Sequence, residues 1–411
     1  MPIDQTTYEK YQSLPASPLR TLIHASIVRA PEGASSSNGF GSELFAKIQM
    51  NESNQCPMLS SDRLCRVQQA GGEALLASTC ATYPRIVKAI GGVDEVALAL
   101  SCPEAARLVL MQPALLTSLN NRGAKAKKSD DVQQDVPIQS RFFEIRNVAL
   151  ELIQNRSYPL WQRLFLMGIL CRRLDEIGTG ELKQSVPKFL AGFQATVDAG
   201  TLRPGMETLP TDGEAQMDVL LRLAGLMLHL SNVRPRFVEC IHAFTTGIGN
   251  GPSATLQSLA AQYARVHERY FQPFFLRQPH ILENYLINAI FRLQFPFGRD
   301  GLKEGASPQM MREFAILTAQ FTLIRGLMIG VAGFHRDSFS AAHVVHTVQA
   351  ASKHFDHHPE FPSRAHALLV ESRMDGARGL AILLRNANSV EGGSVSPSIF
   401  VPRPGVEAAS V

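Results

Sequence analysis

Cysteine and tryptophan are both scarce in this sequence. Its 411 residues include six cysteines and one tryptophan, a composition that excludes a small scaffold held together by disulfides. No two cysteines are close enough in the chain to form a Cys-x-x-Cys knuckle, so the common zinc-finger spacings are absent. The length and the 45% hydrophobic content instead predict an ordinary globular protein with room for more than one domain.

Strong charge, long apolar runs and targeting signals are also missing. The net charge is only +4, and no dense basic run is interleaved with aromatic residues, so we expect no nucleic-acid partner. The polar start MPIDQTTYEKYQSLP is neither a secretory signal nor a transit peptide. The most apolar stretch, residues 314–334, carries Gln320 and Arg325 near its middle and predicts a buried helix and no membrane span. We therefore expect a cytoplasmic protein.

The hydrophobic pattern predicts a mostly α protein in two parts. Residues 1–118 indicate a small, loop-rich α+β module that contains most of the cysteines, with a hairpin at 85–100 around Gly91-Gly92 and a helix that opens at Cys102-Pro103. Residues 119–137 are polar and predict a linker. Residues 138–385 predict an all-α domain, and 386–411 a disordered tail.

The helices expected in the second part follow apolar residues that recur three or four positions apart. None of these segments has the strand-turn-helix order of a parallel sheet. The expected helices are residues 138–154, 160–177, 186–199, 215–230, 236–247, 255–275, 280–293, 308–331, 340–355 and 363–385.

Four of the six cysteines, Cys56, Cys65, Cys80 and Cys102, gather in one short region. Thiolates concentrated in a chain that otherwise avoids cysteine are typical ligands of zinc or of an iron-sulfur cluster. We predict that these four bind such a group, with an iron-sulfur cluster favoured and zinc as the alternative. The other interpretation is that the four cysteines bind no metal and pack as small apolar residues. The remaining two cysteines lie in segments predicted as apolar helices, so we expect their thiols to be buried in the core.

The same region resembles the flagellin lysine-N-methylase family. The resemblance is carried by CPMLSSDRLCRVQQAGGEALLASTCATYPR at 56–85 and SCPEAARL at 101–108. Further similar segments are TTYEKY at 6–11, RPRFVECIHAFTTGIG at 234–249, PHILENYLINAIFRLQFPFG at 279–298 and FTLIRGLMIGVAGFH at 321–335. The resemblance implies a protein-lysine N-methyltransferase that moves methyl groups from S-adenosylmethionine to surface lysines of flagellin.

One departure from the family keeps two alternatives open. The family carries a cysteine-rich block ahead of its Asp-x-x-Thr-Tyr segment, whereas this chain begins at Met1-Pro2-Ile3-Asp4. One alternative is a metal-stapled helical protein that binds flagellin or another secretion substrate without chemistry. The other is a truncated, inactive relative that lacks some cluster ligands.

The methyl-donor site has no clear sequence signal. The one glycine-rich run, Gly247-Ile248-Gly249-Asn250-Gly251, follows a helix rather than a strand, so we interpret it as a helix C-cap and turn. The triplet Cys-x-x-x-Cys-x-x-Cys of radical chemistry is absent. The pairs His343/His346 and His354/His358 lack a third ligand and predict solvated residues at helix ends.

Candidate catalytic residues follow from the chemistry of lysine methylation. Only the neutral amine is nucleophilic, and a free lysine has a pKa near about 10.4, so the site must remove a proton. Glu283, Asn284 and Tyr285 are consecutive polar residues ahead of an apolar helix. We predict that Glu283 and Tyr285 serve the substrate site; a favourably charged first helical turn is the alternative.

Overall fold

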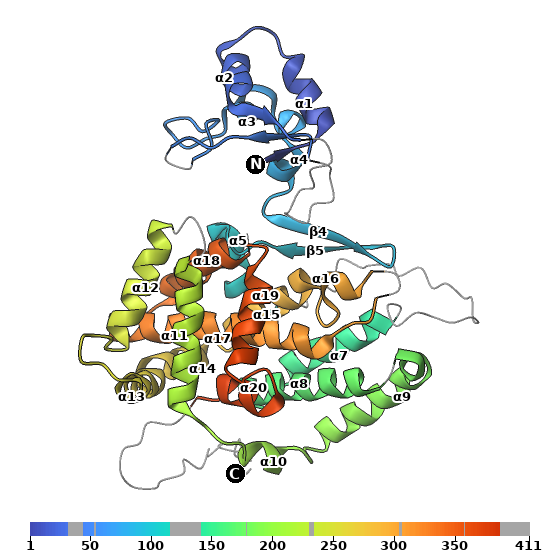
Figure 1. Cartoon of the computed structure of the whole chain (residues 1–411), viewed down its shortest axis with the longest axis vertical. Coiled ribbons are helices and arrows are strands. Elements are labelled where there is room, and N and C mark those ends of the chain that lie inside the picture. The colour runs from blue at the N-terminus through green and yellow to red at the C-terminus, as the bar shows by residue number, and fades with distance from the viewer. Residues whose placement is uncertain are drawn as a thin grey trace, which may run out of the picture.

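The computed structural model describes most of the chain. The described residues are 1–31, 44–52, 55–115, 141–177, 179–229, 234–303, 306–356 and 358–386, without the side chains of 179–184. The predicted linker at 119–137 lies outside them, as does nearly all of the predicted tail. Within the described residues the protein is mostly α-helical, as the sequence predicts (Figure 1).

The N-terminal module combines short helices with a three-stranded antiparallel sheet of order β1-β3-β2. Asp4 and Ser17 accept hydrogen bonds from backbone N–H groups and so cap its first two helices. Its elements are β1 (Pro2–Ile3), α1 (Gln5–Gln12), α2 (Pro18–Ser26), β2 (Ile27–Arg29), β3 (Ala46–Ile48), α3 (Arg66–Gly71), the 3-10 helix η1 (Glu73–Leu75) and α4 (Ser78–Thr82).

A two-stranded hairpin follows the module. Strands β4 (Arg85–Ile90) and β5 (Val93–Leu98) pair antiparallel, with Ile90 opposite Val93. Both turn residues, Gly91 and Gly92, have positive φ angles of 55° and 78°, which glycine adopts without steric cost. The hairpin expected from the sequence is thus confirmed.

The helical domain contains the remaining elements. These are α5 (Pro103–Met111), α7 (Phe142–Gln154), α8 (Leu160–Glu176), α9 (Thr179–Asp198), α10 (Arg203–Glu207), α11 (Gly213–His229), α12 (Pro235–Gly247), α13 (Leu256–Val266), the π-helix η3 (His267–Phe271), α14 (Gln272–Arg277), α15 (His280–Leu293), α16 (Gly298–Gly301), α17 (Met310–His335), the 3-10 helix η4 (Arg336–Ser338), α18 (Ala341–Phe355), α19 (Phe361–Glu371) and α20 (Ala377–Leu384).

Two segments that the sequence predicts as single helices are interrupted. The segment 255–275 contains a π-helical turn ahead of Pro273, a residue that has no N–H to continue the α-helical pattern. The segment 363–385 divides into α19 and α20 because Arg373 takes a positive φ of 56°, which ends the first of these helices.

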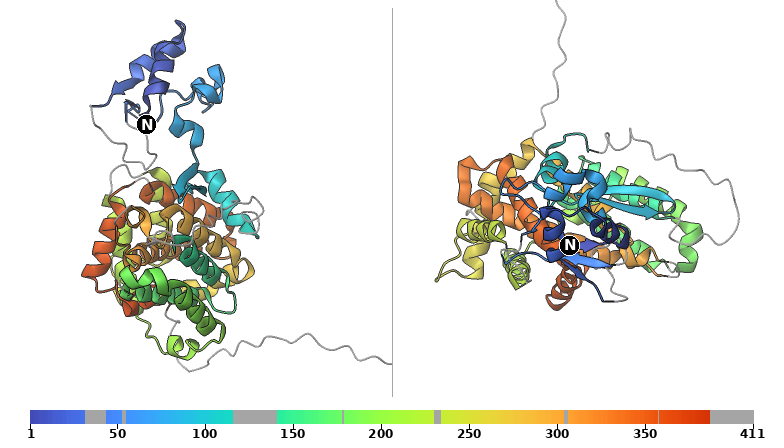
Figure 2. Two further views of the ribbon diagram at one scale, coloured as in Figure 1. Left: turned by 90° about the vertical axis from the view of Figure 1, so that its right-hand side faces the viewer. Right: turned by 90° about the horizontal axis from the view of Figure 1, so that it is seen from above.

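The chain has two separate hydrophobic cores. Eight buried residues from Ile3 to Ala77 form the smaller one. The larger core begins with Ile90 and Leu100, and it includes three residues of α5 together with residues from the helices of the second part. The cores therefore divide the chain before β4, whereas the sequence analysis groups residues 1–118 together. Figures 1 and 2 show the N-terminal module standing at one end of the helical domain, joined to it through the hairpin.

Helix α17 is the central element of the helical domain. Twenty of its 26 residues are buried, including Arg325, which donates hydrogen bonds to the carbonyl oxygens of Leu383 and Leu384 at the end of α20. Together with a bond from Gln216 Nε2 to the carbonyl oxygen of Leu383, they satisfy acceptors at the end of α20. Of the described helices, α17 alone is long and apolar enough to cross a membrane, but its apolar window is fully buried. The prediction of a buried helix at 314–334 is confirmed.

Helices α12 and α17 touch through their backbones. A Cβ atom added to Gly247 of α12 would lie 1.8 Å from the carbonyl oxygen of Gly330 in α17. One added to Gly333 would lie 2.7 Å from the carbonyl oxygen of Gly247. Only glycine permits this approach, because any side chain would force the two helices apart.

We predict that Gly247→Ala destabilises the protein by about 3 kcal/mol or more, because backbone atoms must move to accept the new methyl group. The matched control is Gly225→Ala in α11, where an added Cβ has no neighbour within 4 Å. That change should be neutral or stabilise by up to about 1 kcal/mol through helix propensity. Chemical unfolding of both variants measures the difference. Equal stability of the two variants would contradict the close packing of α12 on α17.

Candidate functional site

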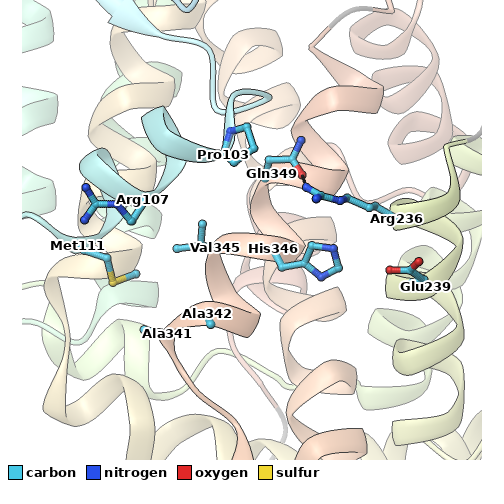
Figure 3. A pocket seen from close by; sticks show the side chains of 10 residues that line it. All are labelled: Pro103, Arg107, Met111, Arg236, Glu239, Ala341, Ala342, Val345, His346 and Gln349. Atoms are coloured by element: carbon cyan, nitrogen blue, oxygen red, sulfur yellow. Dashed lines mark hydrogen bonds between the residues drawn. The ribbon is translucent and has the colours of Figure 1, made fainter. Parts of the chain in front are cut away.

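A cavity of about 730 Å³ opens between α5, α12 and α18. This volume lies within the usual range for small-molecule sites. Pro103 and Met111 of α5 and the first turn of α18 give its wall an apolar part, whereas Arg107 of α5 and the side chains of α12 are charged (Figure 3). The lining residues are Pro103, Arg107, Met111, Arg236, Glu239, Ala341, Ala342, Val345, His346 and Gln349.

Helix α12 supplies the charged side of this cavity. Arg236 and Glu239 are three residues apart and exposed on one face of the helix, whereas Phe237, Cys240 and Phe244 are buried on the other. The spacing follows the helical period, so burial of the apolar face turns the acid and the base together toward the cavity. A cation and an anion are thereby available within one site.

Helix α18 supplies the small and polar side chains of the opposite wall. Ser340 caps this helix, and its N–H donates to Nδ1 of His343 at 3.1 Å, which fixes the first turn. One turn further on, His346 points toward Glu239 (Figure 3). Gln349 donates from Nε2 to the carbonyl oxygen of Ser101 at 2.8 Å and so ties α18 to the start of α5.

The electrostatics of the cavity favour a neutral imidazole. Burial lowers the pKa of His346 below its ordinary value, and the Arg236 guanidinium lowers it further, whereas Glu239 acts in the opposite direction. A histidine that is neutral at pH 7 can accept a proton. Gln349 holds Arg236 through a 3.5 Å contact from Nη1 to its Oε1.

The sequence predicts no functional role for Arg236, places Glu239 on another face of the helix, and predicts a solvated His346. The available signal was weak: two charged residues three apart on a helix whose other face is apolar. That pattern is common to most surface helices. What distinguishes these residues is the packing of α12 near α5 and α18, which lie roughly a hundred residues away in the chain on either side.

Glu283, one of the two predicted catalytic residues, lies inside the helical domain. Its carboxylate is 8% exposed and pairs with Arg156 and Arg163, each at 2.6 Å. Arg163 is itself 7% exposed. The carboxylate oxygens are thus occupied by charge-assisted hydrogen bonds that join α15 to α8 and to the segment before it. Glu283 does not line the cavity.

Asn284 and Tyr285 are also buried. The Asn284 side chain donates to the carbonyl oxygens of Val109 and Gln112 at 2.9 and 2.7 Å, and thereby caps the end of α5. The Tyr285 hydroxyl is buried and has no hydrogen-bond partner among the described residues. Burial raises the pKa of Tyr285 above its ordinary value. The catalytic role assigned to Glu283 and Tyr285 stays a prediction.

The predicted metal ligands lie in two places. Cys56, Cys65 and Cys80 pack against the small N-terminal core, whereas Cys102 stands at the N-terminus of α5. Burial raises the pKa of Cys80 to about 11, and the nearby Cys56 and Cys65 raise it as well. Among the described residues, no three His, Cys, Asp or Glu side chains converge closely enough to hold a metal ion. The four cysteines as arranged therefore do not fit a shared metal centre.

Other residues weighed from the sequence have structural positions. Cys171 and Cys240 are buried core thiols, as predicted. His354 is buried, and its Nε2 accepts a hydrogen bond from the Arg234 N–H at 3.1 Å. Burial lowers the pKa of His354 to about 4. Its interpretation as a solvated residue is wrong, because α18 packs His354 against Phe237 of α12.

Comparison with known proteins identifies related sequences. Residues 146–383, more than half of the chain, match the family model described as the FliB lysine N-methylase C-terminal domain. The lysine-N-methylase of Salmonella typhimurium strain LT2 is 20% identical over 369 residues, which cover 86% of this chain and 85% of the relative.

Two further relatives match shorter stretches. The lysine-N-methylase of Salmonella choleraesuis strain SC-B67 is 22% identical over 58% of this chain and 59% of its own length. The flagellar biosynthetic protein FliU of Salmonella muenchen is 30% identical over 27% of this chain and 62% of its own length. No solved structure matches the chain.

We predict that Glu283→Ala destabilises the protein by about 3–5 kcal/mol, because the buried Arg163 loses its anionic partner. The matched substitution Tyr285→Phe should change stability by less than about 0.5 kcal/mol or stabilise, since the hydroxyl it removes is buried without a partner. Chemical unfolding gives both values, and an assay of lysine methylation tests the second variant for activity. A large loss of activity in a fully stable Tyr285→Phe protein would show that the hydroxyl serves catalysis.

Proposed function

Because this chain belongs to the FliB lysine N-methylase family, we propose that it transfers methyl groups from S-adenosylmethionine to lysine side chains of flagellin in the cytoplasm. The names of the relatives support both parts of the proposal: two are lysine-N-methylases and one is a flagellar biosynthetic protein. The match to the first relative extends over most of both chains. This coverage favours a shared activity over similarity confined to one short segment.

The observation that carries the site assignment is the combination of charges in the cavity between α5, α12 and α18. A lysine methylase must attract a cationic amine, remove its proton and orient its lone pair. Glu239 supplies the anion and His346 a neutral proton acceptor on the facing helix. Glu283, by contrast, is already paired with two arginines.

The same cavity suits the methyl donor. S-adenosylmethionine, when bound, supplies a methyl group on a positively charged sulfur atom. Its amino-acid part carries a carboxylate that Arg236 would pair with, supported by Gln349. Its uncharged parts would pack against Met111, Val345 and the small residues that begin α18. These contacts are assigned from the chemistry of the lining side chains.

The chain's own residues have distinct tasks in this proposal. Glu239 holds the lysine ammonium near the cavity, and the apolar wall strips water from it, which lowers the pKa of the amine. His346 then accepts the proton from the lysine nitrogen and releases it to solvent. The neutral amine is the form that accepts the methyl group.

The structure favours fewer metal ligands than the four cysteines predicted from the sequence. Of the four cysteines, only Cys56, Cys65 and Cys80 share one core, so we propose these three as ligands of an iron-sulfur cluster or of zinc, whose binding would have to draw the thiols closer together than they stand in this structure. The bound group would stabilise a module whose apolar core contains only eight buried residues among those described. No step of methyl transfer is assigned to it.

We predict that His346→Gln lowers kcat by about 10²-fold or more through loss of the proton acceptor. Glu239→Gln should raise KM for a lysine substrate by about tenfold, since it removes one charge-assisted contact. Both residues are partly exposed, so thermal stability should not change. The matched control is Glu151→Gln, which changes an exposed glutamate on α7 and should leave the reaction rates at their wild-type values.

The pH dependence of the same assay isolates His346. In the wild type, kcat should fall as the pH drops through the pKa of His346, because the protonated imidazole cannot accept a proton. This acidic limb should be absent in His346→Gln. A variant that keeps the wild-type rate and pH profile would contradict the assigned role. Binding of flagellin without any methyl transfer by the wild type would instead support the alternative of a non-catalytic binding protein.

We predict that anaerobically purified protein contains iron and sulfide, or zinc, and that Cys56→Ser/Cys65→Ser removes the metal because two of the three ligands are lost. The matched control Cys102→Ser should keep it, since Cys102 lies on the helical side of the hairpin. Elemental analysis with a visible absorption spectrum measures both. Metal retained in the double variant, or lost in Cys102→Ser, would contradict the three-cysteine assignment.

A further inference from the structure

A second cavity, of about 760 Å³, lies at the opposite end of α12 from Arg236 and Glu239. It is formed where the C-terminus of α12 meets α13, the π-helix η3 and the end of α17. The glycine-rich turn that follows α12 contributes Gly247 and Gly249 to its lining. The sequence analysis interprets this run as a helix C-cap and turn, which the end of α12 at Gly247 and the positive φ of Gly249 confirm. The same turn also forms part of a binding-sized hollow.

The charge of this second cavity has one sign. Arg265, Arg269 and Arg336 all line it, and no aspartate or glutamate does. Arg265 contacts the side-chain oxygen of Gln262, and Arg269 lies 5.4 Å from the centre of the Tyr270 ring. Within the described part of the chain, none of the three guanidinium groups forms an ion pair. Three arginines therefore line one cavity whose lining contains no carboxylate.

Aromatic side chains accompany the arginines. Tyr270 and Phe334 both line the cavity, and Phe334 is 42% exposed. An exposed phenylalanine beside a hollow offers a flat surface on which a planar ring can stack. The combination of guanidinium groups and aromatic faces is typical of sites that bind phosphate and a base in one ligand.

The backbone around this cavity is irregular on two sides. Arg269 and Tyr270 lie in a five-residue π-helix, a rare form that occurs often at functional sites. Arg336, directly after α17, has a positive φ of 51°, which is uncommon for a residue with a side chain. Both irregularities position residues that line the cavity.

We propose that this cavity binds a phosphorylated nucleotide, with the arginines on the phosphates and Phe334 or Tyr270 against the base. The ligand differs from that of the first cavity, because the first contains Glu239 next to Arg236 and suits a ligand that carries both signs of charge. A cavity with only cations disfavours an ammonium group and favours a polyanion. The site therefore goes beyond the proposed methyl-transfer function.

Isothermal titration of the full chain with ADP tests this proposal. ADP should bind with one-to-one stoichiometry, and the affinity should fall as salt is added. Arg269→Ala and Arg336→Ala should each weaken binding by about tenfold or more, since each removes a charge-assisted contact. The matched control is Arg378→Ala, an exposed arginine on α20, which should bind ADP as the wild type does. Circular dichroism verifies that every variant is folded.

Two further probes separate the parts of the ligand. Phe334→Ala should weaken ADP but leave inorganic pyrophosphate unchanged, and pyrophosphate should bind the wild type more weakly than ADP does. Failure of ADP to bind, or equal binding by the arginine variants and the wild type, would overturn the proposal. Pyrophosphate binding as tightly as ADP would overturn the assignment of a base contact.

A competition titration separates the two cavities. Saturating S-adenosylhomocysteine should leave ADP affinity unchanged, because the two ligands occupy opposite ends of α12. Displacement of ADP would overturn a separate site. No methyl transfer is needed for these measurements, so their outcome is independent of whether the methylase proposal succeeds.

Discussion

The contact between the backbones of α12 and α17 determines where both cavities lie. Gly247 rests against Gly330 and Gly333 without any intervening side chain, so the position of α12 is set by α17, most of whose residues are buried. The first turn of α12 carries Arg236 and Glu239 into one cavity, and its last turn borders the other. A rigid helix fixed at its C-terminal end can hold both sets of side chains in place.

The two cavities differ in the sign of the charges that line them. One is lined by a glutamate, two arginines, a neutral imidazole and several apolar side chains. The other combines three arginines with two aromatic rings. Charge composition, more than volume, distinguishes what each can bind, because the volumes are similar and a buried ionic ligand needs a partner of opposite charge. Membership of a lysine methylase family accords with the first cavity and leaves the second unexplained.

Much of the fold could be predicted from local sequence signals. Gly91-Gly92 predicts the hairpin because only glycine takes two positive φ angles easily, and recurrent apolar residues predict the helices. The interruptions at 267–271 and 372–376 were missed, since they depend on a proline and on one residue with left-handed backbone rather than on hydrophobic period. The position of β4, β5 and α5 on the helical core also escaped prediction, because composition does not show which core a short element joins.

The candidate site was harder to predict than the fold. The sequence points to Glu283 and Tyr285 because they are polar residues ahead of an apolar helix, yet that pattern also describes a buried ion pair and a buried hydroxyl. Residues such as Glu239 and His346 are a hundred positions apart in the chain and meet only through the packing of α12 beside α18. His354 shows the same limit: Lys353 and Asp356 lie near it in the sequence, but Phe237 from another helix packs against it.

The most direct test of the account is a structure of the full chain with S-adenosylhomocysteine bound. We predict that this product lies between α5, α12 and α18, with its carboxylate on Arg236 and its sulfur atom directed toward the space between Glu239 and His346. Density for the product anywhere else, in the N-terminal module or in the arginine-lined cavity, would contradict the assignment of the methyl-transfer site.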